Sequence, residues 1–181
     1  MKATGIVRRI DDLGRIVIPK EIRKTFHIKE SDPMEIFINK EGEIILKKYS
    51  PVGEMSSFAK TYAESLAQAS GHMAVITDRD MIIAATGALK THIGKQVSKE
   101  LESCMNNRET LTASKGAKNF ISIIEENVEE ISDIAVATIL AAGDVAGSVC
   151  LISTKGQVEF GEVERKLVQT AAGFIGRQLE E

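Results

Sequence analysis

Residues 4–24, TGIVRRIDDLGRIVIPKEIRK, decide the fold of the amino-terminal part of this 181-residue chain. Two short apolar runs, at residues 6–7 and 16–18, flank a turn at residues 11–14. β-Branched residues favour strands, and the glycine of the turn can adopt the positive φ that a tight reversal often needs. Pro19 ends the second run, and proline suits the first turn of a helix. The stretch therefore predicts a β-hairpin followed by a short helix.

Basic side chains are concentrated in the same stretch. Residues 1–24 hold seven Lys or Arg against three acidic residues, a local net charge of +4. Arginine presents planar donors that match phosphate oxygens and the acceptor edge of guanine. We therefore predict a DNA-binding set, and the ordinary alternative is a solvated strand face. The set is Lys2, Arg8, Arg9, Arg15, Arg23 and Lys24.

Two adjacent members of this set raise a geometric difficulty. Successive side chains of a strand point to opposite faces, so strict alternation separates Arg8 from Arg9. Both can reach one partner only where the strand twists, bulges or ends.

The next residues predict a second hairpin. Residues 34–38 alternate in strand fashion, residues 39–42 reverse the chain, and residues 44–46 return as a second strand. A domain of some fifty residues buries too little apolar surface to be comfortably stable alone, and this one contains no cysteine. Association of two subunits would supply that surface and would set two basic ends side by side for a duplex. We therefore expect a dimer.

The segments TGIVRRIDDLGRIVIPKEIRKTFHI (4–28) and DPMEIFINKEGEIILKKY (32–49) resemble the amino-terminal domain of AbrB-type transition-state regulators of spore-forming bacteria. The resemblance implies a swapped-hairpin, or looped-hinge, dimer that binds double-stranded DNA and regulates sporulation genes as activator or repressor. The arginines of the family that contact DNA fall on Arg8, Arg15 and Arg23. Lys24 stands where a relative carries arginine, so its charge is kept but bidentate geometry is lost. Arg9 is a further basic position of the pattern.

The charge balance divides the chain. Its net charge is −3, but residues 1–50 hold 11 Lys+Arg and 8 Asp+Glu, whereas residues 51–181 hold 12 and 18. Charges are screened beyond about 10 Å in physiological salt, so a basic patch can bind DNA while the distant remainder is acidic. Proline and glycine interrupt the pattern where the sign changes. We predict a DNA-binding domain at 1–50, a linker at 51–54 and a second domain at 55–181.

Hydrophobic periodicity in the second part predicts an α+β domain. Its expected elements are helix 55–69, strands 73–77 and 81–85, helix 97–105, a mixed segment 106–130, strands 134–141 and 145–152, and a carboxy-terminal helix. The apolar stripe expected on that last helix is Val163, Leu167, Ala171, Phe174 and Ile175. This order, with VAGSVCL (145–151) and FGE (160–162), resembles a GAF domain, an antiparallel sheet with flanking helices. The resemblance implies a domain that senses a small molecule or stabilises the oligomer.

Candidate catalytic and metal-binding residues are sparse. His27, His72 and His92 lie apart, without the spacing of a metal site. Cys150 lies in an apolar run typical of buried strands, and nothing basic immediately flanks Cys104 to lower its pKa. We therefore expect no cofactor, no metal and no enzymatic activity. A GAF-type small-molecule-binding or redox enzyme and a swapped-hairpin antitoxin remain alternatives.

Localisation and assembly follow from the same patterns. No apolar run approaches the roughly 20 residues needed to span a bilayer, and the amino terminus lacks the pattern of a secretion signal. We therefore expect no membrane partner and a cytoplasmic, nucleoid-associated protein with reduced thiols. The two apolar helices of the second domain either complete its core or pair between subunits. If both domains self-associate, the assembly is a tetramer.

Overall fold

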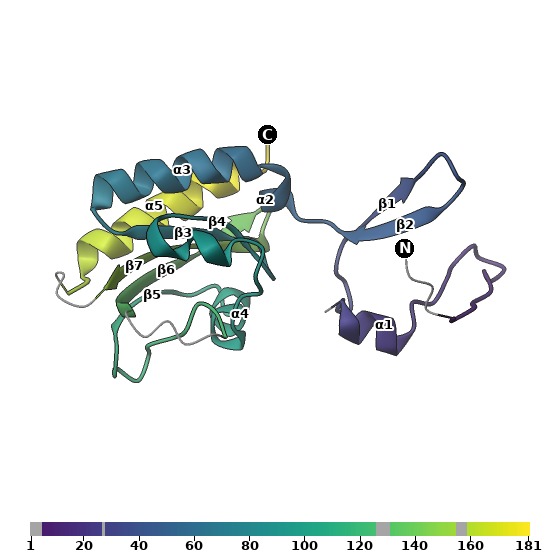
Figure 1. Ribbon diagram of the computed structural model, residues 1–181, viewed down its shortest axis with the longest axis horizontal. Helices are drawn as coiled ribbons and strands as arrows, with labels where there is room; N and C mark the ends of the chain where they lie inside the picture. Colours follow the sequence, from purple (N-terminus) through teal and green to yellow (C-terminus); the bar gives the residue numbers. More distant parts are fainter. Residues whose placement is uncertain (1–4, 27, 126–130, 155–158) are drawn as a thin grey trace. The chain divides into compact units, whose positions relative to one another are not determined.

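The structure, a computed structural model, describes residues 5–26, 28–125, 131–154 and 159–181. The chain divides into two compact units, Met1–Tyr49 and Ser50–Glu181. Each unit contains both helices and strands (Figure 1), so the predicted α+β class is confirmed.

The first unit contains a short helix and a two-stranded sheet. Helix α1 (Lys20–Thr25) begins directly after Pro19, as expected from the fixed φ and missing N–H of proline. Strands β1 (Met34–Ile38) and β2 (Ile44–Lys48) pair antiparallel, with the first residue of β1 opposite the last residue of β2. The predicted second hairpin is therefore confirmed.

The opening stretch forms a tight turn. Gly14 adopts a φ of 74°, and its N–H donates to the carbonyl oxygen of Asp11 at 3.0 Å. The N–H of Asp11 donates to the carbonyl oxygen of Arg15, also at 3.0 Å. Residues 5–19 contain no regular strand, because two such short runs form a marginal ladder within one chain. The predicted first hairpin is present as its turn, without paired strands.

The first unit has no hydrophobic core within one chain. Pro19 is its one buried residue among those that the structure describes. Apolar side chains of both the turn segment and the sheet are exposed, for example Val7 at 85%, Val17 at 70% and Ile38 at 78%. Apolar exposure on this scale marks an interaction surface.

The second unit is built on a five-stranded antiparallel sheet of order β4-β3-β7-β6-β5. Its strands are β3 (Met73–Thr77), β4 (Ile82–Ala85), β5 (Thr110–Ser114), β6 (Ile131–Ala141) and β7 (Asp144–Thr154). Positive φ at Ala142 and Gly143 forms the two-residue turn that joins β6 to β7. Strand β5 lies in the segment for which periodicity predicted no element.

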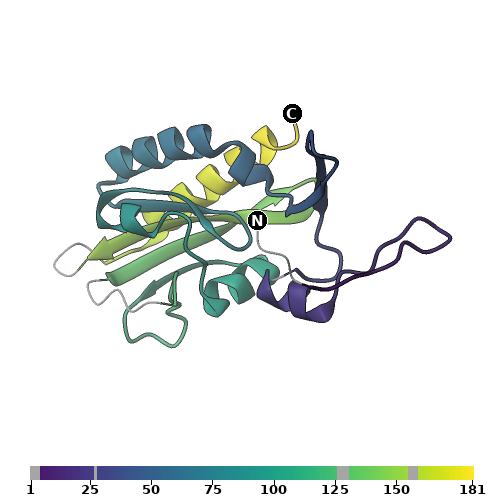
Figure 2. The same cartoon turned by 45° about the vertical axis from the view of Figure 1, so that its right-hand side comes forward.

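Helices cover both faces of this sheet (Figures 1 and 2). Helices α3 (Ser56–Ser70) and α5 (Glu162–Gln178) pack on one face, and α4 (Lys99–Asn106) packs on the other. A short 3₁₀ helix, η1 (Gly87–His92), follows β4. Because side chains alternate along each strand, the unit has two cores. One contains Ala63, Ile76, Leu151 and Ile175, and the other contains Leu101, Met105, Ile134 and Cys150.

The buried face of α5 differs from the predicted stripe. Ala171 and Ile175 are buried as expected, but Val163 is 67% exposed and Phe174 is 37% exposed. Val168 lies on the buried face instead. The prediction was wrong at these positions because a helix rich in apolar residues presents two adjacent apolar faces, and periodicity does not say which one meets the sheet.

Residues 51–54, interpreted from the sequence as a linker, form the short helix α2 (Pro51–Glu54). The Ser50 hydroxyl accepts the Gly53 N–H at 3.0 Å and donates to Asp78 Oδ2 at 2.6 Å. Val52 is 1% exposed and packs in the core that α3 and α5 share with the sheet. This helix is therefore packed within the second unit.

Candidate nucleic-acid interface

The basic residues of the candidate set lie on consecutive segments of the first unit. Two precede the tight turn, one follows it, and two lie in the last turn of α1. All five that the structure describes are exposed, namely Arg8, Arg9, Arg15, Arg23 and Lys24. Lys2 lies outside the described residues.

Four of these cations are not neutralised by the part of the chain that the structure describes. The side chains of Arg8, Arg9, Arg23 and Lys24 make no hydrogen bond or ion pair with another described residue. Both neighbouring arginines before the turn are exposed, on a segment that has no strand structure within one chain. Exposed guanidinium groups of this kind suit phosphate and base-edge acceptors.

Arg15 is held by an ion pair inside its own turn. Its Nε donates to Asp11 Oδ2 at 2.8 Å, while the Arg15 side chain stays 70% exposed. Asp11 Oδ1 accepts the backbone N–H groups of Leu13 at 3.0 Å and of Arg15 at 2.8 Å. The backbone N–H of Arg15, followed by its guanidinium, lowers the pKa of the Asp11 carboxyl. The sequence pattern indicates Asp11 only as a turn residue, although an Asp that opens a turn commonly accepts nearby backbone N–H groups.

A second ion pair ties the loop after α1 to the end of β2. Lys48 Nζ lies 3.1 Å from Asp32 Oδ2, and that oxygen also accepts the Lys29 N–H at 2.8 Å. The Tyr49 N–H donates to the carbonyl oxygen of Pro33 at 3.0 Å. These contacts give Lys48 a structural role and fix the loop that connects the basic helix to the sheet.

The thiols of the second unit are unreactive. Cys104 is 3% exposed and Cys150 is fully buried. Burial raises the pKa of Cys104 to about 11 and that of Cys150 to about 12. Because cysteine attacks as the thiolate, both side chains are poor nucleophiles at neutral pH. The redox-enzyme alternative therefore lacks its reactive group.

Other chemistry is also missing from the described ranges. They contain no group of three or more His, Cys, Asp or Glu that could hold a metal ion. Within these same ranges, no helix combines the length and the hydropathy needed to cross a bilayer. His27 falls outside them.

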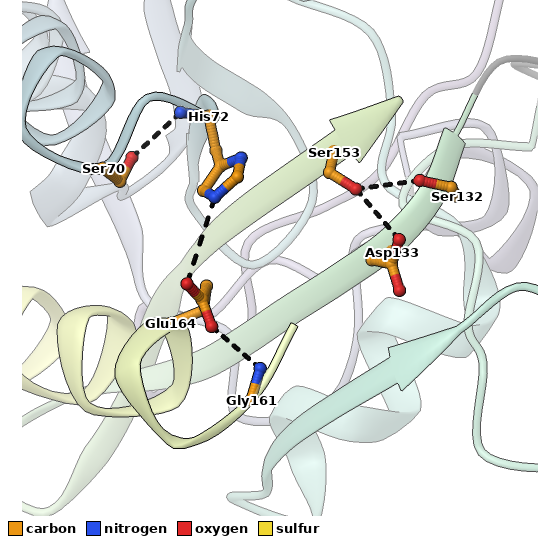
Figure 3. Close-up of polar contacts among 7 residues, drawn as sticks. All are labelled: Ser70, His72, Ser132, Asp133, Ser153, Gly161 and Glu164. Carbon is orange, nitrogen blue, oxygen red and sulfur yellow. Dashed lines mark hydrogen bonds and ion pairs between the residues drawn. The ribbon is translucent and has the colours of Figure 1, made fainter. Parts of the chain in front are cut away.

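Polar side chains hold the segment that leads into α5 (Figure 3). Glu164 Oε2 accepts the Gly161 N–H at 2.8 Å, which satisfies one donor at the helix start. Glu164 Oε1 lies 4.0 Å from His72 Nε2. The His72 ring packs edge-on against Phe160, with ring centroids 4.6 Å apart. The start of α5 is thus tied to the residue that precedes β3.

The side chain of Asp133 lies among serine hydroxyls of neighbouring strands, of which Figure 3 shows Ser153 and Ser132. Asp133 is 5% exposed and accepts the hydroxyl protons of Ser114 at 2.5 Å and Ser153 at 3.0 Å. Burial opposes ionisation of this carboxyl, but hydrogen bonds from Ser114, Ser132, Ser153 and the Phe160 backbone outweigh it and lower its pKa. An ionised carboxylate on β6 is therefore bonded to serine hydroxyls of β5 and β7.

A pocket of about 470 Å³ opens beside His72, near the end of α3. Gln68, Met73 and Thr86 contribute to its lining. Nδ1 of His72 is buried and has no hydrogen-bond partner among the described residues.

Helices α3 and α5 share an aromatic cluster of Phe58, Tyr62 and Phe174. The ring centroids of Tyr62 and Phe174 are 5.5 Å apart, and Phe58 lies 5.9 Å from the first and 6.1 Å from the second. All three side chains are only partly buried in one chain. The cluster therefore forms an apolar surface beside the core.

Comparisons with known proteins match both units. Residues 54–180 match the family described as "Stage V sporulation protein T C-terminal, transcription factor", and residues 7–54 match "Antidote-toxin recognition MazE, bacterial antitoxin". The chain is 59% identical over 51 residues to the transition state regulatory protein AbrB of Bacillus subtilis, which is 28% of this chain and 52% of that protein. The resemblance to AbrB-type regulators is therefore confirmed.

The GAF-like fold of the second unit is also confirmed. The GAF domain of an Acinetobacter phosphoenolpyruvate-protein phosphotransferase superposes with a TM-score of 0.56 at 12% identity. The match covers 74% of this chain and 84% of that one. A likeness at such low identity concerns the fold alone.

One relative matches the chain from end to end. Stage V sporulation protein T of Bacillus subtilis (strain 168) is 50% identical over 182 aligned positions, which cover 100% of both chains. The alignment joins the basic amino-terminal unit and the GAF-like unit in the same order. The chain therefore belongs to the stage V sporulation protein T family, a family of sporulation transcription factors and not of enzymes.

Proposed function

We propose that the first unit binds double-stranded DNA as a swapped-hairpin dimer and so regulates sporulation genes. The proposed contacts are Arg8, Arg9, Arg15, Arg23 and Lys24, with Lys2 as a further candidate. The observation that carries the proposal is the exposure of all five described cations on a unit with no core in a single chain. Folding and DNA binding would then require the same pairing of subunits.

The exposed apolar side chains support the dimer. Ile16 is 54% exposed and Val17 is 70% exposed, yet both have the β-branched character of strand residues. A second copy would offer strand edges for residues 5–19 and would cover the apolar face of the sheet. Pairing would also bring two sets of cations to one duplex, as dimeric DNA-binding proteins require.

The domain boundary follows from the same packing. We propose that residues 1–49 form the DNA-binding domain and residues 50–181 the GAF-like domain. The buried Val52 supports the assignment of α2 to the second domain. The charge of the first domain stays positive, because its basic residues all precede Tyr49.

The salt dependence of binding tests the DNA contacts. Fluorescence anisotropy with a labelled duplex should show log affinity falling with log salt, at a slope of about −0.9 per phosphate neutralised. Arg23→Ala should weaken binding and flatten that slope. Lys60→Ala, which removes an exposed cation of α3, should leave both unchanged. A flat salt response of the wild-type protein would reject the proposed interface.

We further propose that the second unit completes a tetramer through its aromatic cluster. Partly exposed aromatic residues are frequent anchors of subunit interfaces. Phe174→Ser should convert tetramers into dimers in sedimentation velocity. Lys166→Ala, at an exposed position of the same helix, should leave the tetramer intact. Equal sedimentation of both variants and the wild type would remove the aromatic cluster from the interface.

The pocket beside His72 supports a second role for this unit, the binding of a small molecule. A screen for metabolites that raise the melting temperature of the protein would identify this small molecule, and Gln68→Ala should abolish the shift.

A DNA-binding role also makes a cytoplasmic, nucleoid-associated location our proposal, which imaging of a fluorescent fusion tests.

A further inference from the structure

A single carboxylate organises the turn between the two apolar runs of the first unit. Asp11 accepts three hydrogen bonds, two from backbone N–H groups and one from the Arg15 guanidinium. Both residues of this pair are exposed, so no core packing accounts for it. The carboxylate therefore couples the shape of the turn to the direction of one cation.

We propose that Asp11 is a positioning residue, which orients the Arg15 guanidinium so that it reads DNA rather than only neutralising it. This inference rests on the proposed role of Arg15 as a DNA contact. The bond from Asp11 uses Nε, and the terminal Nη groups are the pair that matches two acceptors on a guanine edge. Asp11 thus holds the guanidinium at Nε, and the two Nη groups remain available for the guanine edge.

Two opposing effects of Asp11 can be separated. Its negative charge repels phosphates, which weakens binding to every DNA sequence. Its hydrogen bond orders a long side chain before DNA arrives, which reduces the entropy lost on binding. The second effect requires correct geometry, so it should favour the specific complex over the non-specific one. The proposal is that ordering outweighs repulsion in the specific complex.

The neighbouring Asp12 provides a matched control. It is exposed and carries the same charge one residue away, but it makes no hydrogen bond or ion pair with another described residue. Asp12→Asn and Asp11→Asn therefore remove equal charge. Asparagine at position 11 keeps an oxygen acceptor for the Leu13 and Arg15 N–H groups, so the turn is preserved while the charged partner of Nε is lost.

The test uses full-length protein and two labelled duplexes. One is selected from a random library by the wild-type protein, and the other is a scrambled version of equal composition. Both variants should bind the scrambled duplex as tightly as the wild type or more tightly. Asp11→Asn should lower the ratio of selected to scrambled affinity by about threefold or more, a typical coupling between contacting residues. Asp12→Asn should keep the ratio.

The Arg15→Ala background separates positioning from turn shape. If Asp11 acts through Arg15, Asp11→Asn and Asp12→Asn should have the same ratio of selected to scrambled affinity in that background. The NMR signal of Arg15 Nε–H should also shift in Asp11→Asn and stay in place in Asp12→Asn. The inference would be overturned if Asp11→Asn and Asp12→Asn had the same affinity ratio in the wild-type background. It would also be overturned if their affinity ratios still differed in the Arg15→Ala background. If Arg15→Ala itself leaves both affinities unchanged, the proposed DNA contact fails, and that result is distinct from either of the others.

Discussion

The two units of this protein bury apolar side chains in different ways. The second unit buries Ile76, Leu151 and Ile175 to 2% exposure or less within one chain. The first unit leaves Val7 85% exposed and Ile38 78% exposed. A unit that lacks its own core depends on its partner, so its folding and its binding surface form together. A unit with its own core keeps its fold without a partner.

Separating the units should have the largest effect. A fragment of residues 1–49 should unfold on dilution, because its proposed folded form is a dimer and each tenfold dilution costs about 1.4 kcal/mol of apparent stability. A fragment of residues 50–181 should remain folded across the same series. Thermal melts by circular dichroism at several concentrations measure both. A folded monomer of residues 1–49 in sedimentation equilibrium would contradict the contrast between the units.

Trimming the second unit sharpens its boundary. Starting the fragment at residue 55 instead of 50 removes Val52 and the Ser50 hydroxyl that donates to Asp78. We expect a loss of about 3 kcal/mol, since burial of one valine contributes roughly 1.5–3 kcal/mol and a hydrogen bond to a charged group roughly 1.5–3 kcal/mol. Urea denaturation of the two fragments measures the difference. Equal stability of the two fragments would place the start of the second domain at residue 55, as predicted from the sequence.

Two glycines of α5 test how tightly the second unit is packed. A Cβ at Gly176 would overlap the carbonyl oxygen of Leu140, whereas a Cβ at Gly173 would meet open space. Gly176→Ala should destabilise this unit by about 2–3 kcal/mol through overpacking. Gly173→Ala should be neutral or stabilising by about 0.5–1 kcal/mol, because alanine favours the helix. Similar urea midpoints for both variants would show that α5 is not closely seated on β6.

Local patterns predicted the regular elements well. The run at residues 73–77 is β3 without a residue of difference, and residues 34–38 are β1. Contacts distant in sequence explain what was missed. Val52 is buried by side chains far along the chain, and β5 is a strand because β6 offers it an edge.

The candidate site shows the same division. The identity and exposure of the cations were evident from their concentration in one stretch, since charged side chains away from a core remain in solvent. The hydrogen bond from Arg15 to Asp11 was not evident from the sequence. A net charge counts Asp11 as one negative charge and does not show which cation it contacts. This bond requires the turn geometry at Gly14, which brings Nε of Arg15 to 2.8 Å from Oδ2 of Asp11.

A buried acid of the second unit provides the smallest expected effect. The pKa of Asp133 is lowered in the folded protein, so ionisation stabilises the fold above the unfolded value near 4. This contribution is lost as the pH falls from about 4 through the folded value. Asp133→Asn should therefore cost about 1–2 kcal/mol at neutral pH, since hydroxyl donors of a buried site lose a charged acceptor. It should also make the loss of stability in acid less steep.

The exposed Asp144, at the start of β7, is the control for this measurement. Asp144→Asn should change the free energy of unfolding, measured by urea denaturation, by less than about 0.5 kcal/mol at any pH, as is usual for surface substitutions. Asp11 of the first unit also has a lowered pKa, but its carboxylate is exposed and serves one cation. Asp11→Asn should therefore alter DNA selectivity and leave the denaturation of the second unit unchanged, whereas Asp133→Asn should do the reverse. If both variants changed both properties, the two units would not be energetically separate, and the contrast in how they bury apolar side chains would no longer explain their roles.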